Sequence, residues 1–282
     1  MELRSVVGEY YLKLLCRVLS RPLESPLTAR WLYGAGLFPR SCVRPVNRWG
    51  MNLTLDLHDQ VSRMLYFLGS HEAEEMRLIS SSLRPDSVAL DICAHVGGYS
   101  LFMAHLLDPA RGRVYSFEPD PRNFARLQHH CKANNLCHVT PIPRAMGAAG
   151  GTVDFFLAPS KNSGMSSLMA RGQEYTRTTV TVTTIDDFVR QAGLQRLDFI
   201  KMDAEGFEGD ILRGGRETFL QHHPAMLMEL NGTALARRDS TCGDIIRLLH
   251  EMGYAVRHAD AAGAEVRPDE LGPDGFANVY CR

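Results

Sequence analysis

From residue 85 onward the sequence alternates between short apolar strands and amphipathic helices, and this rhythm constrains the fold more than any other feature. A buried strand at 88–92 precedes a helix at 98–107, and a second strand at 113–117 precedes a helix that begins after Asp120, a typical N-cap. Strands joined by helical crossovers form parallel sheets. The chain is therefore predicted to be an α/β protein, with helices on both faces of a mostly parallel sheet.

The same rhythm continues to the end of the sequence. We expect a helix capped by Thr184 and ending at Gln191, and another that starts at Ser240 or Thr241 and stops at Gly253. Segments 254–258 and 276–281 have the pattern of a closing antiparallel pair, which brings the sheet to seven strands. The remaining three strands are expected at 138–142, 198–202 and 225–230, with a helix between the last two. Two further β-rich segments, at 152–157 and 180–184, flank a loop around 162–168.

Residues 1–80 differ from the rest and are predicted to form an N-terminal extension to a domain at 81–282. Apolar residues recur at helical spacing between Val6 and Leu19, and an irregular connector is expected at 22–50. A short strand at 52–57 and a helix at 72–83 complete the extension. Its first helix is interpreted as packing on the protein itself or on a second subunit, with a membrane surface as the alternative.

Charge and cysteine usage exclude several classes of protein. The net charge is −1 and basic residues are scattered, so nucleic acid is not expected as a partner. The seven cysteines include no C-x-x-C pair, which indicates neither a disulfide framework nor a zinc site and favours the cytoplasm. No uncharged apolar run is long enough to cross a bilayer, and the cleavage pattern of a signal peptide is absent.

The residues that directly follow the first two strands are the first candidates for a binding site, because ligands of open α/β sheets lie outside the carboxyl ends of the strands. A tight turn rich in small residues follows Asp91 and leads into a helix. Glu118 follows the second strand, where a carboxylate can accept hydrogen bonds from both hydroxyls of a ribose. This pair of features favours a nucleotide site, the alternative being an ordinary turn and a solvated acid.

The stretch around these residues resembles the FkbM family of methyltransferases, whose first-strand motif reads D-x-G-A-N-x-G. Here that motif is Asp91-Ile92-Cys93-Ala94-His95-Val96-Gly97. Further marks of the family follow in order, and the similarity covers residues 60–231. These marks are Phe117-Glu118-Pro119-Asp120 with Asn123-Phe124, Asn134-Asn135-Leu136, Thr183-Thr184-Ile185-Asp186-Asp187, Asp198-Phe199-Ile200-Lys201-Met202-Asp203-Ala204-Glu205-Gly206 and Gly214-Gly215.

The resemblance implies a class I methyltransferase with a Rossmann-like fold, S-adenosylmethionine as donor, and transfer to an oxygen of a small molecule or glycan, at a hydroxyl or carboxyl. Two positions depart from the family: Cys93 replaces glycine and His95 replaces asparagine. A side chain at the glycine position either crowds the ligand or demands an unusual backbone angle. The residues expected to contact the donor are Asp91, Cys93, Ala94, His95, Gly97, Glu118, Pro119 and Ala145.

Acids at the ends of the fourth and fifth strands are the candidates for catalysis, because methyl transfer needs an aligned acceptor whose proton is removed as it attacks. Asp203 and Glu229 are predicted to act directly, with Lys201 and Glu205 in support. A further hypothesis is that Asp203, Glu229 and Asn231 hold a divalent cation such as Mg²⁺. The alternative is that the two acids act by hydrogen bonding or as proton acceptors without metal.

The sequence leaves two alternatives to a methyltransferase, an oxidoreductase and a binding protein. A nicotinamide-dependent oxidoreductase requires G-x-G-x-x-G after the first strand, and this chain has only Gly97 and Gly98 there. A donor-impaired or non-catalytic binding protein that keeps the methyltransferase fold is the alternative that Cys93 and His95 suggest. The acceptor is expected to be a small molecule or glycan, and a homo-oligomer could form through the first helix.

Overall fold

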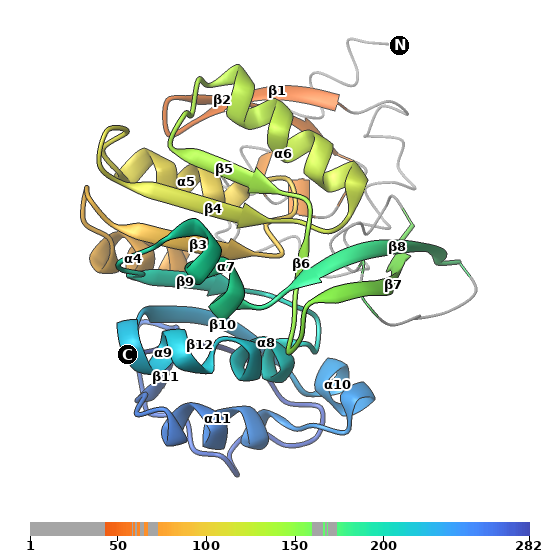
Figure 1. Ribbon diagram of the computed structural model, residues 1–282, viewed down its shortest axis with the longest axis vertical. Helices are drawn as coiled ribbons and strands as arrows, with labels where there is room; N and C mark the ends of the chain where they lie inside the picture. Colours follow the sequence, from red (N-terminus) through yellow and green to blue (C-terminus); the bar gives the residue numbers. More distant parts are fainter. Residues whose placement is uncertain are drawn as a thin grey trace, which may run out of the picture.

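A seven-stranded sheet forms the centre of the protein (Figure 1). The computed structural model describes residues 43–57, 59, 61–62, 65–66, 73–159, 166, 168 and 174–282. The strand order is β11-β12-β10-β9-β3-β4-β5, and every pair is parallel except those of β12, which is antiparallel to β10 and β11. The predicted fold class and the closing antiparallel pair are therefore confirmed. The strands are β3 (Val88–Ile92), β4 (Arg113–Phe117), β5 (Val139–Ile142), β9 (Phe199–Met202), β10 (Ala225–Asn231), β11 (Val256–His258) and β12 (Phe276–Cys281).

The central strands read as continuous apolar runs because both faces of the sheet are covered. All four residues of β9 and four of the five in β3 are buried. Asp91 in β3 and Lys201 in β9 are polar exceptions, and they are Cα partners in adjacent strands. Buried charged groups of opposite sign at one point of a sheet indicate a local electrostatic role rather than packing alone.

Helices from the two halves of the chain cover opposite faces of the sheet. The first apolar core contains residues of α4, α5 and α6 packed on one face, and the second contains residues of α7, α8, α9 and α11 packed on the other. Two short turns of helix follow β10. The helices are α4 (Ala73–Ser82), α5 (Gly98–Leu106), α6 (Pro121–Ala133), α7 (Ile185–Ala192), α8 (Glu208–Gly214), α9 (Arg216–His222), α10 (Gly232–Leu235), η2 (Ala236–Arg238) and α11 (Cys242–Glu251).

The expected helix starts agree with the structure because their caps form. The side chains of Asp120, Thr184 and Thr241 each accept a hydrogen bond from a backbone N–H in the first turn of the following helix. Thr241 and Asp244 form a reciprocal capping box. The single helix expected between the fourth and fifth strands is instead two, α8 and α9, which meet at Gly215.

A second, three-stranded sheet carries the β-rich segments on either side of the 160–173 region. Its order is β6-β8-β7, with β6 (Ala145–Met146), β7 (Gly151–Leu157) and β8 (Thr176–Thr183). β7 and β8 form an antiparallel arm beside the main sheet, visible in green in Figure 1. β6 was not expected from the sequence, since two residues carry no usable periodicity.

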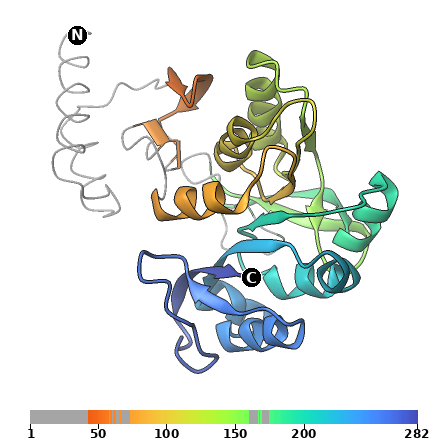
Figure 2. The same cartoon turned by 90° about the vertical axis from the view of Figure 1, so that its left-hand side faces the viewer.

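The region before residue 81 contains a hairpin where the sequence analysis expected an irregular connector up to residue 50. β1 (Val43–Arg48) pairs antiparallel with β2 (Met51–Asp56) across a two-residue turn, and this part of the connector prediction is wrong. The hairpin packs on α6, and Figure 2 shows the two side by side. The helix predicted between Val6 and Leu19 lies outside the described residues. No helix in the part of the chain that the structure describes is long and apolar enough to cross a membrane.

Candidate functional site

The turn between β3 and α5 is held in an unusual backbone conformation. Cys93 has φ +62° and His95 has φ +53°, in the left-handed region that favours glycine. The turn is fixed because Ala94 N–H donates to the Phe117 carbonyl at 2.9 Å and Gly97 N–H donates to the Ala94 carbonyl at 2.8 Å. A glycine at position 93 would adopt this φ angle without strain. Cys93 adopts the same left-handed conformation, and its side chain faces the pocket.

Glu118 lies at the carboxyl end of β4 and is almost completely buried. One carboxylate oxygen accepts the His95 N–H at 2.7 Å and the other accepts the Asp120 N–H at 2.8 Å. Burial raises the pKa of Glu118 to about 8, against the effect of these two backbone hydrogen bonds. Each oxygen keeps a lone pair for a ligand.

Asp91, Lys201 and Tyr99 form the next part of the site, toward β9. Ser100 donates to the Asp91 carboxylate, and burial raises the pKa of Asp91 to about 6 although Ser100 and Lys201 oppose the shift. The Lys201 ammonium lies 4.9 Å from the centroid of the Tyr99 ring, within cation–π range. The Tyr99 hydroxyl in turn donates to Glu75 of α4 at 2.5 Å.

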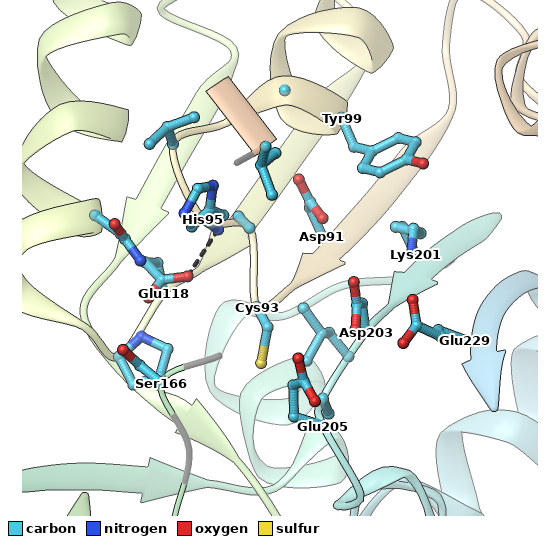
Figure 3. A pocket seen from close by; sticks show the side chains of 18 of the residues that line it. Asp91, Cys93, His95, Tyr99, Glu118, Ser166, Lys201, Asp203, Glu205 and Glu229 are labelled. Atoms are coloured by element: carbon cyan, nitrogen blue, oxygen red, sulfur yellow. Dashed lines mark hydrogen bonds between the residues drawn. The ribbon is translucent and has the colours of Figure 1, made fainter. Parts of the chain in front are cut away.

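Three more carboxylates lie on the same side as Lys201. Asp203 and Glu205 come from the loop after β9 and Glu229 comes from β10, and Figure 3 shows the three gathered on one side of the pocket. The loop is fixed by Glu208, whose buried carboxylate accepts the N–H groups of Ala204 and Gly206 at 3.0 and 3.3 Å. Asp203 and Glu205 therefore lie on a turn whose backbone is held by hydrogen bonds, and Glu229 lies on strand β10.

These residues surround one pocket at the carboxyl ends of β3, β4, β9 and β10 (Figure 3). Most of the residues predicted for donor binding and catalysis line it together. They are Asp91, Cys93, Ala94, His95, Glu118, Pro119, Lys201, Asp203, Glu205 and Glu229.

Three predicted residues do not line this pocket. Gly97 is the N-cap of α5 with φ +93°, and its missing side chain makes room for leucines of the core. Ala145 is buried in β6, within the small core of the second sheet. The Asn231 side chain accepts the Ala234 N–H at 3.2 Å and caps α10.

The residues proposed for a divalent cation do not form a metal site in the structure. Within the described ranges, no group of three or more His, Cys, Asp or Glu side chains is arranged to hold a metal ion. Because Asn231 is engaged as a cap, Asp203 and Glu229 have no third oxygen ligand from that residue. The described residues therefore give no support for the predicted cation.

Sequence reasoning missed several lining residues. Asn123 was visible only as part of a family motif, whereas Tyr99 carried no signal. The Ser166 hydroxyl donates to the Asp120 carboxylate at 2.8 Å and accepts a hydrogen bond from the Arg122 guanidinium at 3.3 Å, beside the start of α6. The region before residue 81 also contributes to the wall. The lining residues without a sequence-based role are Val61, Leu65, Met76, Ile92, Val96, Gly98, Tyr99, Asn123, Phe155, Ser166 and Ala204.

Comparison with known proteins places the chain in one family. The pattern of the Methyltransferase FkbM domain matches residues 91–256. The 2-O-methyltransferase NoeI of Sinorhizobium fredii is 29% identical over 158 residues, which span 50% of this chain and 63% of the relative. The hexuronic acid methyltransferase AglP of Haloferax volcanii is 22% identical over 175 residues, or 61% of this chain and 67% of that protein.

A solved structure, methyltransferase FkbM from Methylobacillus flagellatus, aligns with 79% of this chain and 52% of its own at 18% identity and a TM-score of 0.46. The chain thus spans less than two thirds of NoeI and about half of the solved chain. The match of the family pattern covers more than half of the chain and includes the turn after β3, the end of β4 and the loop after β9. The chain belongs to the FkbM family of methyltransferases.

Proposed function

We propose that the protein transfers a methyl group from S-adenosylmethionine to an oxygen of a small molecule or sugar. The observation that carries the proposal is the pocket at the carboxyl ends of four strands, with buried Glu118 at the second and a cluster of carboxylates at the fourth and fifth. Because the bound donor supplies a methyl group already activated by its sulfonium, the protein needs only to align the acceptor and take up its proton.

The two ends of the pocket suit different tasks. Glu118 is proposed to accept hydrogen bonds from the ribose hydroxyls of the donor, since each of its oxygens has a lone pair beyond the backbone contact. The turn after β3 suits the amino-acid end of the donor, because the first amides of α5 favour a carboxylate. Asp203 or Glu229 is proposed to take the acceptor proton, with Lys201 and Glu205 beside them.

We propose the chemical class of the methyl acceptor from the names of two relatives. NoeI is described as a 2-O-methyltransferase and AglP as a hexuronic acid methyltransferase, so sugars modified at a hydroxyl or carboxyl are the first candidates to test. Calorimetry with S-adenosylhomocysteine tests the donor site. A screen of sugars and cell extracts for incorporation of label from S-adenosylmethionine tests the reaction, and donor binding without any incorporation would contradict an enzymatic role.

A donor-impaired binding protein is the second candidate, favoured by one observation. Burial raises the pKa of the Cys93 thiol well above its ordinary value, so an uncharged side chain stands in the pocket where the family has glycine. Absence of affinity for both S-adenosylmethionine and S-adenosylhomocysteine would support this alternative.

The remaining assignments are also proposals. We propose a catalytic unit at 81–282 with an N-terminal extension at 1–80 that contributes to the pocket wall through Val61, Leu65 and Met76. The described cysteines are free, which supports a reducing compartment such as the cytoplasm. An acceptor other than nucleic acid and a homo-oligomer formed through the first helix remain predictions, testable by methylation assays with RNA and by sedimentation.

A further inference from the structure

Asp59 is a completely buried acid in the N-terminal segment, before the region that matches the family. One of its oxygens accepts the Ser62 N–H at 2.9 Å, which fixes the carboxylate. The other lies 3.8 Å from Nε2 of His95, an electrostatic contact longer than a hydrogen bond. Because the protein interior screens charge only weakly, a buried carboxylate at this distance acts strongly on the imidazole of His95.

His95 is the residue of the pocket that Asp59 faces. It lines the pocket, and its own N–H is held by Glu118 at 2.7 Å, so its position relative to the ribose site is fixed through the backbone. Burial lowers the pKa of the imidazole; Asp59, Asp120 and Asp203 oppose this shift, and Arg126 adds to it. A neutral imidazole has one N–H donor and one acceptor nitrogen.

A carboxylate beside one ring nitrogen determines which nitrogen carries the proton and how the ring is oriented. With Asp59 near Nε2, the proton is favoured at Nε2 and the ring offers a defined pattern of donor and acceptor. An asparagine amide, the family residue at this position, would need no such partner, because its donor and acceptor groups are chemically fixed. The pairing of His95 with Asp59 therefore gives the turn a defined polar group where the family has an amide.

We propose that Asp59 is a positioning residue that orients the His95 ring toward the amino-acid end of the methyl donor. The inference rests on the proposed function, since it assumes that S-adenosylmethionine occupies the pocket. The amino-acid end is the part concerned because Glu118 already occupies the ribose side, and His95 lies in the turn that leads to the first amides of α5. The N-terminal segment then completes the donor site, rather than serving only as a cover for the sheet.

The test compares two ligands that share adenosine but differ at the amino-acid end. Affinities of S-adenosylhomocysteine and 5′-methylthioadenosine are measured by calorimetry for the full chain, for three single variants and for the double variant that combines Asp59→Asn with His95→Asn. Asp59→Asn keeps the size and an acceptor oxygen but removes the charge, and His95→Asn introduces the family residue. Glu74→Gln is the control, because Glu74 also precedes residue 81 but pairs with Arg77 at 2.8 Å and does not line the pocket.

We expect Asp59→Asn to weaken S-adenosylhomocysteine about tenfold, the effect of losing one polar contact to a charged group, and to leave 5′-methylthioadenosine unchanged. Glu74→Gln should change neither affinity. Adding Asp59→Asn to His95→Asn should cause no further loss, because Asp59 acts through His95. Thermal unfolding of each variant verifies that the protein is folded at the temperature of the titration.

The inference is overturned if Asp59→Asn weakens both ligands equally, since that pattern indicates a general loss of pocket structure. It is also overturned if the two substitutions are additive, because Asp59 would then act without His95. If the unsubstituted protein binds neither ligand, the proposed function itself fails, and the inference fails with it.

Discussion

Replacing Glu118 by glutamine is the most informative single change, because its effect on donor binding has a predicted magnitude and a predicted pH dependence. The variant keeps the shape of the side chain but loses the charge. One of the two backbone N–H groups, those of His95 and Asp120, then also loses its acceptor. Losing charge-assisted hydrogen bonds in a buried site costs about 1.5–3 kcal/mol, or roughly ten- to a hundredfold in affinity.

The pH dependence follows from the raised pKa. With a pKa of about 8, Glu118 is mostly protonated at pH 6.5 and mostly ionised at pH 8.5. Ribose hydroxyls donate to the ionised form, so affinity should rise about twentyfold over this interval, in proportion to the ionised fraction. Calorimetry with 5′-methylthioadenosine isolates the effect, because this ligand has no amino or carboxyl group of its own that titrates.

Glu118→Gln should bind this ligand weakly and equally at both pH values. Glu217→Gln, at an exposed acid outside the pocket, is the control and should behave like the unsubstituted protein. Equal affinity of the unsubstituted protein at pH 6.5 and 8.5, or unchanged binding by Glu118→Gln, would remove Glu118 from the ribose site.

Four further outcomes are expected. Cys93→Gly, which relieves a φ of +62°, should melt at an equal or higher temperature and bind S-adenosylhomocysteine at least as tightly; clearly weaker binding would make the thiol a necessary part of the pocket. Gly206→Ala should lower the melting temperature by several degrees, because φ is +101° and the new Cβ would lie 2.6 Å from a carbonyl oxygen; an unchanged melting curve would contradict this. The ligand-free protein should lose stability as pH rises from about 7 to 8. The folded-state pKa values of Glu118 and Glu208 are raised to about 8 and 7, so these two groups bind more protons in the folded state than in the unfolded one in that window, whereas the lowered pKa values of His95 and His130 act in the opposite direction at lower pH; a melting temperature that rises instead would refute it. Methyl transfer to an acceptor found by the screen should persist after exhaustive chelation, whereas loss with recovery on added Mg²⁺ would restore the metal hypothesis.

The parallel sheet could be predicted because its strands are short, apolar and bounded by turn residues. Two strands, Val88–Ile92 and Arg113–Phe117, have the bounds that the sequence pattern indicates. The helix starts were equally accessible, since a cap is a local interaction between neighbouring residues. The positions that depend on strand ends were therefore predictable as well, and they account for ten of the 21 residues that line the pocket.

The second strand of the hairpin before residue 57 was expected at 52–57, but the first strand was missed although a signal was present. Trp49 and Gly50, with φ +50° and +76°, form a two-residue turn of the kind that joins antiparallel strands. Pro45 in β1 argued against a strand, yet a two-stranded hairpin tolerates proline at positions outside a central ladder. The two-residue turn at Trp49 and Gly50 was therefore a stronger indication for the hairpin than Pro45 was against it.

Contacts between distant segments were beyond the sequence. Nothing local indicates that Tyr99 reaches Glu75, or that Asn231 is used as a helix cap and so withdrawn from the acids beside it. Asp59 likewise shows no motif; its role emerges only because the fold brings it next to His95. Side chains of this kind are set by tertiary packing rather than by periodicity.

The position of β12 has a consequence for how the chain reaches its native state during synthesis. β12 follows β11 in the sequence but lies between β10 and β11 in the sheet. While the ribosome is still adding the residues between the two strands, β11 has no strand to pair with at its final place, and the edge of β10 is open. The β10-β12-β11 part of the sheet can therefore close only after β12 has emerged.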